Sequence, residues 1–176
     1  MQDSSYQQRI HDELARLGIP MDWIIAKQLP FYPEARELVV AEADAQGREY
    51  LLTPAAAQAW QNMKQAAAGD GIALEIVSSF RTIERQIDII RNKIARNMPM
   101  ETILTLSAPP GYSEHHSGRA IDINTPGCVP TEEEFADTDA FRWLERHAAR
   151  FDFRLSYPRG NTLGFIYEPW HWCHHG

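Results

Sequence analysis

The feature of this sequence that most constrains its fold is a histidine and an aspartate, His115 and Asp122, on either side of a glycine. If both side chains reach one common site, their ends must lie within a few ångströms of each other. A continuous helix would separate them by about 10.5 Å along its axis, and a fully extended chain by about 23 Å. The chain must therefore turn between them, and Ser117-Gly118 is the flexible point. We expect His115 on a loop and Asp122 on the strand that follows.

A second polar cluster lies near the C-terminus, in the sequence EPWH at 168–171. A catalytic zinc ion typically takes three protein ligands and leaves a fourth position for water. His115, Asp122 and His171 would supply three ligands, and Glu168 can face the water without binding the metal. A carboxylate in that place takes the proton from a water molecule that attacks a carbonyl group. The pattern therefore predicts an open, hydrolytic metal site with one zinc ion.

Length and composition are ordinary for a soluble globular protein. The chain has 176 residues, of which 44% are hydrophobic and 23% charged, and this suits one domain with one core. The formal net charge of −7 argues against nucleic acid as a partner, because such binding depends on a basic patch. Cys128 and Cys173 are too few for a disulfide framework. We expect a single monomeric domain over residues 1–176 that binds no nucleic acid.

The sequence shows neither a membrane span nor a signal peptide. No stretch approaches the roughly 20 apolar residues that cross a bilayer. The N-terminal residues MQDSSYQQ have neither a basic region nor an apolar one. We expect no transmembrane segment. Two locations stay open: the cytoplasm for the chain as written, and the periplasm or cell envelope if an export signal has been removed.

Hydrophobic periodicity predicts an α+β fold, in which helices flank a small, mainly antiparallel sheet. The expected helices are residues 4–17, 54–68, 82–96 and 137–150, with one helical turn near 100–104. The expected strands are residues 72–78, 119–124, 151–157 and 165–173, with a hairpin within 37–52. Residues 19–35 are predicted to be irregular. We expect the N-terminal helix and hairpin, residues 1–50, to pack on a catalytic core of residues 51–176.

These motifs together resemble the VanY-like zinc D-alanyl-D-alanine carboxypeptidases, a family that includes related L,D-carboxypeptidases. The resemblance runs from about residue 29 to 172, and its strongest part is Ser-x-His-x-x-Gly-x-Ala-x-Asp at 113–122 followed by EPWH at 168–171. It includes SFRT at 79–82 with Gln86, where the family usually shows Gly-Tyr-Arg-Ser and a later glutamine. The resemblance implies the Hedgehog/D-Ala-D-Ala peptidase fold, and a peptidoglycan stem peptide or muropeptide as the substrate.

The resemblance also implies a role for each matching residue. His115, Asp122 and His171 resemble the zinc ligands, and Glu168 resembles the general base. For an isolated histidine the ordinary interpretation is a hydrogen-bonded structural residue. The family spacing of all three favours metal binding instead.

Three further residues are expected to meet the substrate. Arg81 resembles the arginine that meets a substrate carboxylate or carbonyl, a task that suits a planar guanidinium. An ion pair with Glu84 is the alternative. Ser113 and Gln86 look like substrate-contacting positions. The alternatives are that Ser113 only caps or braces its loop, and that Gln86 belongs to a surface-like helix face.

The chain departs from the family pattern in places. Ser79 and Phe80 replace the usual Gly-Tyr, His116 stands where glutamine is common, and the tail WCHH at 172–175 is unusual. None of these changes removes a ligand or the base, but they leave the preferred peptide open. We expect His116 to lie behind the site or to face solvent, and Cys173 and the histidines after it to form a mobile chain end.

We therefore predict a zinc metallopeptidase that hydrolyses the terminal peptide bond of bacterial cell-wall stem peptides and releases a C-terminal D-amino acid, as a D,D- or L,D-carboxypeptidase. A peptidoglycan endopeptidase or D,D-dipeptidase of the same fold is one alternative, and would differ in how far its cleft extends. A zinc-binding interaction module without turnover, as in Hedgehog signalling domains, is another. Glu168 and Arg81 favour an enzyme, because a chain without turnover has little reason to keep them.

Overall fold

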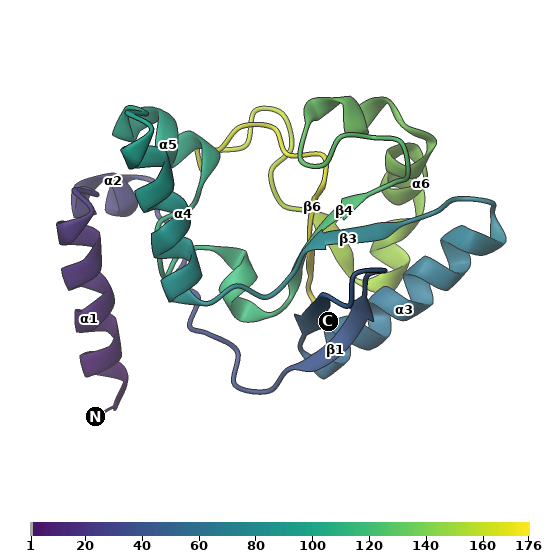
Figure 1. Cartoon of the computed structure of the whole chain (residues 1–176), viewed down its shortest axis with the longest axis horizontal. Helices are drawn as coiled ribbons and strands as arrows, with labels where there is room; N and C mark the ends of the chain where they lie inside the picture. The colour runs from purple at the N-terminus through teal and green to yellow at the C-terminus, as the bar shows by residue number, and fades with distance from the viewer. Residues whose placement is uncertain (1) are drawn as a thin grey trace.

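The computed structural model describes residues 2–176 and confirms the predicted α+β class (Figure 1). The α-helices are α1 (Gln2–Arg16), α2 (Met21–Ala26), α3 (Pro54–Gly69), α4 (Ile83–Ala95), α5 (Met100–Leu106) and α6 (Asp139–His147). The strands are β1 (Val39–Ala43), β2 (Glu49–Leu52), β3 (Glu75–Ser78), β4 (Ala120–Asn124), β5 (Phe153–Leu155) and β6 (His171–His174). Three 3₁₀ helices are η1 (Glu114–Ser117), η2 (Glu133–Asp137) and η3 (Ala148–Phe151).

The strands form two antiparallel sheets. A four-stranded sheet has the order β3-β4-β6-β5, and β1 pairs with β2 in a separate hairpin. In the central pair, Asp122 on β4 lies opposite His171 on β6. This register brings two residues from distant parts of the chain to the same place in the sheet.

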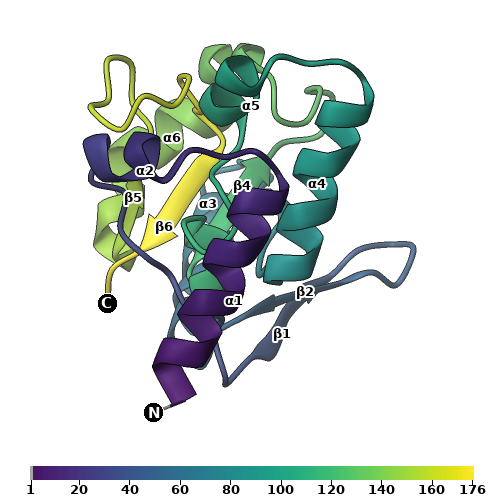
Figure 2. The same cartoon turned by 90° about the vertical axis from the view of Figure 1, so that its left-hand side faces the viewer.

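The helices divide into two groups around the central strands. In Figure 1, α1, α2, α4 and α5 lie on one side of β4 and β6, while α3 and α6 lie on the other. Each group has its own buried hydrophobic cluster. One cluster joins α3 and α6 to the sheet, with Trp60, Ile121 and Phe153 at its centre. The other joins α1 to α4 and α5 through Ile10, Leu14 and similar side chains, and Figure 2 shows α1 beside α4.

Local sequence signals explain where two of these helices begin. Thr53 precedes α3 and Pro54 occupies its first turn, where a missing N–H costs nothing. Thr82 caps α4, since its Oγ1 accepts a hydrogen bond from the Arg85 N–H at 3.1 Å. On α4 the predicted apolar stripe is buried at Ile83, Ile87 and Ile90.

Three sequence-based expectations are wrong. Residues 19–35 are not wholly irregular, because α2 lies within them. The expected strand 165–173 starts only at His171 and runs to His174. Pro169 has no N–H for a ladder, and the backbone turns at the bond from His171 N to Glu168 O. Cys173 and His174 are not a mobile end: both belong to β6 and are buried.

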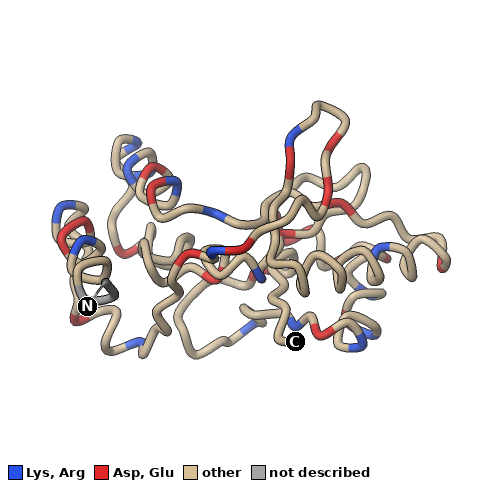
Figure 3. Tube along the Cα trace, turned by 90° about the horizontal axis from the view of Figure 1, so that it is seen from below, with Lys and Arg blue, Asp and Glu red and all other residues tan. Residues whose placement is uncertain are grey.

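Residues of both charge signs are distributed along the described chain (Figure 3). None of the described helices is both long enough and apolar enough to cross a membrane.

Candidate metal centre

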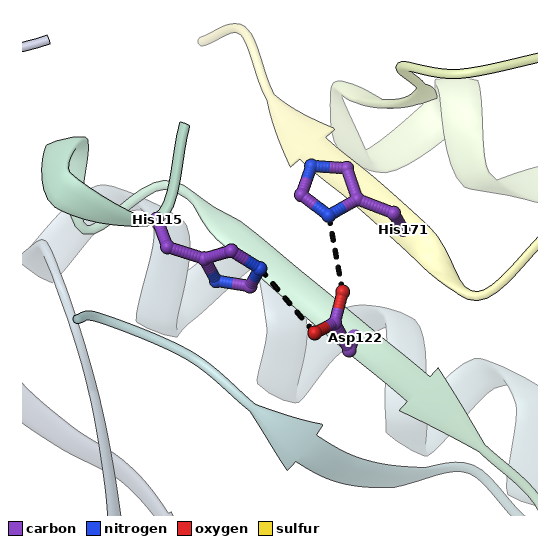
Figure 4. A group of neighbouring side chains, drawn as sticks. All are labelled: His115, Asp122 and His171. Atoms are coloured by element: carbon purple, nitrogen blue, oxygen red, sulfur yellow. Dashed lines mark hydrogen bonds and ion pairs between the residues drawn. The ribbon is translucent and has the colours of Figure 1, made fainter. Parts of the chain in front are cut away.

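His115, Asp122 and His171 converge on one buried point. One ligand atom from each of the three lies within 4.8 Å of the others. His115 Nε2 is 3.3 Å from Asp122 Oδ2, and His171 Nδ1 is 3.0 Å from Asp122 Oδ1 (Figure 4). The carboxylate of Asp122 thus lies between the two imidazole rings.

The backbone between His115 and Asp122 reverses at Gly118, as the spacing predicts. His115 lies on η1, Gly118 follows with φ of 65°, and β4 then carries Asp122. A Cβ atom at Gly118 would lie 2.8 Å from Leu38 Cδ2 and 3.1 Å from Ala35 Cβ. Glycine is therefore required both by the left-handed backbone and by the close approach of the segment before β1.

Hydrogen bonds behind the rings select which nitrogen of each histidine faces the centre. His115 Nδ1 is 2.8 Å from the carbonyl oxygen of Ser79, so it donates its proton there and leaves the Nε2 lone pair free. His171 Nε2 is 2.9 Å from Glu114 Oε2, which leaves Nδ1 facing Asp122. Two imidazole nitrogens and one carboxylate oxygen, each held by an outer partner, form a donor set that fits a zinc ion.

Burial and hydrogen bonding act in opposite directions on the pKa values of His171 and Asp122. Burial alone would lower the pKa of His171, but its hydrogen bonds to Asp122 and Glu114 raise it to about 10. Burial would raise the pKa of Asp122, but the neighbouring histidines, His115 first, hold it well below its usual range. Burial lowers the pKa of His115, which stays neutral. A metal cation would take the place of the His171 proton.

Glu168 lies beside the cluster without being part of it. Its Oε2 is 3.8 Å from His171 Nδ1, and the turn that closes on His171 N places it there. Burial raises the pKa of Glu168 to about 7, even though the charge of His171 acts in the opposite direction. A carboxylate with such a pKa takes up and releases a proton near neutral pH.

Arg81 lies close to Asp122. Its Nη2 is 3.9 Å from Asp122 Oδ2 and donates to Ser78 Oγ at 3.0 Å. Its Nη1 donates to Gln86 Oε1 at 2.8 Å. No ion pair between Arg81 and Glu84 occurs in the described part of the chain. The guanidinium is therefore fixed close to the candidate metal ligands.

A cavity of about 290 Å³ adjoins these residues. Its lining includes the metal cluster with Glu168 and Tyr157, together with residues of α4 and of the end of α5. The cavity thus adjoins both the metal cluster and the helix group of α4 and α5, and it is of a size to admit the end of a peptide.

Comparison with known proteins identifies this arrangement. Residues 49–176 match the family described as VanY, D-alanyl-D-alanine carboxypeptidase. The chain belongs to the VanY family. The matched residues contain every side chain of the metal cluster, together with Glu168 and Arg81.

VanY-family relatives include a D-alanyl-D-alanine carboxypeptidase of Enterococcus faecalis, 34% identical over 126 residues, which cover 66% of this chain and 45% of that protein. A putative carboxypeptidase of Bacillus subtilis is 29% identical over 150 residues, which cover 81% of this chain and 55% of that protein. The chain thus matches about half the length of these relatives.

Two solved structures share the VanY-family fold. The LD-carboxypeptidase LdcB superposes with a TM-score of 0.73 and 29% identity, over 81% of this chain and 70% of LdcB. A vancomycin-resistance D,D-pentapeptidase VanY variant, in complex with Zn(II), superposes with a TM-score of 0.65 and 28% identity, over 85% of this chain and 89% of that one.

The structure places the other two predicted substrate contacts in this VanY-family site. Gln86 is not on a surface-like face: it is 1% exposed, its Oε1 accepts from Arg81 and its Nε2 donates to the Ala108 carbonyl at 2.7 Å. Ser113 is buried, lines the cavity and makes no side-chain capping bond to η1. Contact of either residue with substrate stays a prediction.

Sequence reasoning missed Glu114. Besides His171, this buried carboxylate accepts hydrogen bonds from Ser156 Oγ at 2.5 Å and Tyr32 OH at 3.4 Å. Burial would raise the pKa of Glu114. Its hydrogen bonds with His171 and Ser156, and the charges of His171 and His115, lower it instead to about 2. Its place next to a predicted ligand was the signal available in the sequence, whereas its partners come from distant segments.

His116 is buried rather than solvent-facing, which corrects one of the two expectations for it. Its Nδ1 donates to the Arg81 carbonyl at 2.6 Å, and its Nε2 accepts from the Gly111 N–H at 3.2 Å. Burial lowers the pKa of His116 to about 4, so the ring is neutral and serves as a brace. It ties the backbone of Arg81 to the segment that carries His115.

Proposed function

We propose that this chain is a zinc-dependent carboxypeptidase that hydrolyses the terminal peptide bond of bacterial cell-wall stem peptides and releases a C-terminal D-amino acid. The observation that carries the proposal is the convergence of His115, Asp122 and His171 on one wall of a cavity, with Glu168 beside them. Membership of the VanY family supports it, as do neighbours described as VanYB in complex with D-alanine-D-alanine and as a Zn(II) complex.

The proposed reaction divides the work between the metal and the protein. A zinc ion held by the three ligands supplies Lewis-acid polarisation of the scissile carbonyl and lowers the pKa of water in the site. Glu168 accepts a proton from the water whose oxygen bonds to the carbonyl carbon. When the C–N bond breaks, Glu168 gives that proton to the leaving amine, so one water is consumed and two products form.

Arg81 has an electrostatic task in this scheme. Its guanidinium is held by Ser78 and Gln86 at 3.9 Å from a ligand oxygen. That position favours contact with the carbonyl oxygen, where negative charge develops during attack. Burial lowers the pKa of Arg81, yet the carboxylates of Asp122 and Glu168 favour its charged form and its ordinary pKa is high, so it stays a cation.

Mass spectrometry of defined stems after incubation with the zinc-loaded protein tests the proposal. Loss of one terminal D-Ala from a pentapeptide stem indicates D,D-activity, and loss from a tetrapeptide stem indicates L,D-activity. Release of D-Ala-D-Ala as a dipeptide would support a D,D-dipeptidase, and cleavage of cross-linked dimers an endopeptidase. The Glu168→Gln variant is the control. No cleavage of any stem, while a chelator still lowers the melting temperature, would support a binding module instead.

We also propose that residues 1–50 complete the catalytic domain and that the protein is a monomer. Ile10 and Leu14 of α1 share a buried cluster with Ile83 and Ile87 of α4, the helix that forms one wall of the cavity. Light scattering of the purified chain over a range of concentrations tests the oligomeric state.

A further inference from the structure

The backbone around Arg81 is held by hydrogen bonds from several directions. Phe80 N donates to Leu51 O at 3.0 Å. Arg81 N donates to His115 O at 3.1 Å. These two bonds join backbone atoms, so a side-chain substitution leaves their donors and acceptors in place. Two further bonds to the same stretch of chain come from side chains, and the position of Arg81 therefore depends partly on residues that can be replaced.

The first of these side chains is His116, which is fully buried. Its Nδ1 donates to the carbonyl oxygen of Arg81 at 2.6 Å, and its Nε2 accepts from the N–H of Gly111 at 3.2 Å. A neutral imidazole has one donor and one acceptor nitrogen, and both are used here. The ring therefore joins the backbone of Arg81 to the loop that precedes η1.

The second side chain is Glu34, in the segment before β1. Its Oε1 accepts from the N–H of Ile83 at 2.6 Å. Ile83 is the first residue of α4, and Thr82 alone separates it from Arg81. The N–H groups in the first turn of a helix have no partner within the helix, and a carboxylate also suits the positive end of the helix dipole. Glu34 thus fixes the point at which the chain leaves Arg81 and enters α4.

The segments that carry these two side chains are joined to each other. Ala35 N donates to His116 O at 2.8 Å. Tyr32 N donates to Gly111 O at 2.7 Å. The segment with Glu34 is therefore attached to the same loop that carries His116. Neither Glu34 nor His116 is among the described residues that line the cavity, so both hold Arg81 from outside the space that a peptide would enter.

We propose that His116 and Glu34 are positioning residues, which together hold the backbone of Arg81 so that its guanidinium meets the substrate carbonyl. The inference rests on the proposed function, in which Arg81 stabilises the developing oxyanion. A displacement of about 1 Å at a reacting group can cost about 100-fold in rate. Replacement of either residue should therefore lower kcat and leave the zinc affinity little changed. Because both act through Arg81, neither replacement should cost more than the loss of Arg81 itself.

A double-mutant cycle on the zinc-loaded protein tests this role. His116→Leu removes both hydrogen bonds of the ring at nearly constant volume, and we expect kcat to fall about 10- to 100-fold. Glu34→Ala should cause a smaller fall, because the bonds from His116 and the backbone remain. In the Arg81→Ala background either replacement should cost little more activity, because the residue through which it acts is gone.

Conservative variants separate lost hydrogen bonds from general damage. His116→Gln should retain most of the activity, because its amide supplies one donor group and one acceptor, as the neutral imidazole does. Glu34→Gln should retain more than Glu34→Ala, since its amide oxygen still accepts from Ile83 N–H. Glu37→Ala, at an exposed position in the same segment, is the matched control. The melting temperature and the zinc affinity of each variant show that it is folded.

A second measurement does not depend on turnover. In the metal-free, isotope-labelled protein, the NMR signal of the Arg81 Nε–H group, identified by its absence in Arg81→Ala, reports how firmly the guanidinium is held. We expect this signal to shift, and its proton to exchange faster with water, in His116→Leu and in Glu34→Ala. It should be unchanged in Glu37→Ala.

The two measurements together separate this inference from the proposed function. Losses of activity that add fully to that of Arg81→Ala would overturn it, and so would a parallel loss of zinc affinity, since the two residues would then act on the fold or on His115. If no stem is cleaved but the Arg81 signal depends on both residues, the proposed function fails and the positioning stands. If stems are cleaved and the signal is the same in every variant, the reverse holds.

Discussion

Glu114 Oε2 and His171 Nε2 lie 2.9 Å apart, and this hydrogen bond turns the other nitrogen of the His171 ring toward Asp122. The carboxylate is itself held by Ser156 and Tyr32. We therefore predict that Glu114 positions the ring of His171 for metal binding.

Replacement of Glu114 by alanine should weaken zinc binding about 10- to 100-fold, because the ring of His171 loses its orienting acceptor. Glu114→Gln should lose less zinc affinity than Glu114→Ala, since its amide oxygen still accepts the hydrogen bond from His171 Nε2. Competition with a chromophoric chelator measures the affinity. Glu132→Ala, at an exposed position, is the control. Equal affinities for Glu114→Ala and the unmodified chain would show that the bond does not position the ligand.

Zinc binding should release a proton from His171. In the metal-free protein the pKa of His171 is about 10, so at pH 8 the ring is protonated and must give up that proton to bind metal. The apparent affinity should therefore rise with pH, by up to about tenfold per unit, until the pH passes 10. Calorimetry at pH 8 in buffers of different ionisation enthalpy counts the protons. A count of zero would contradict the protonated cluster.

Glu168→Gln should keep zinc and lose about 10²- to 10⁴-fold in kcat, because the amide cannot accept the proton of water. In the unmodified enzyme kcat/KM should fall as the pH falls and Glu168 becomes protonated. Its pKa is about 7 without metal, and a bound dication lowers it, so the fall should lie at or below pH 7. A flat profile from pH 5 to 8 would argue against Glu168 as the base.

Arg81→Ala should also retain the metal and lose about 10²- to 10³-fold in activity, the usual cost of one electrostatic donor to the developing oxyanion. Gln86→Ala, which removes a hydrogen-bond partner of Arg81, should cause a smaller loss. Arg85→Ala on the exposed face of α4 is the matched control. Full zinc occupancy with unchanged kinetics in Arg81→Ala would rule out this role.

Gly118→Ala should destabilise the fold more than Gly160→Ala. Both glycines have positive φ, 65° and 74°, so each alanine costs about 1–2 kcal/mol in backbone energy. Only at Gly118 would the new Cβ meet Leu38 and Ala35, and such overpacking adds about 1–3 kcal/mol. Urea unfolding of the metal-free variants measures the difference. Equal losses in the free energy of unfolding would show that the segment with Ala35 and Leu38 shifts away from the new Cβ at no cost in stability.

The chemistry of the site and much of the fold depend on residues that are close together in the sequence. These features could therefore be predicted. The reversal at Gly118 follows from the spacing of His115 and Asp122, because no regular element brings their side chains together. Helix α4 begins after Thr82, whose side chain caps it, and α3 begins at Pro54, because both signals are local. The order of residues thus determined the candidate ligands and the elements that carry them.

Tertiary structure decided what surrounds that set, because the deciding contacts join distant segments. Glu114 meets His171 through the packing of η1 against β6, and no local pattern contains that contact. Gln86 looks like a surface residue on α4, but in the fold it is buried, and the segment that follows α5 supplies the Ala108 carbonyl as its partner. Nothing in the sequence distinguishes the roles of the two cations Lys93 and Arg81. Only burial and partners in the fold distinguish them, because a cation's role depends on which of its donors the protein has already used.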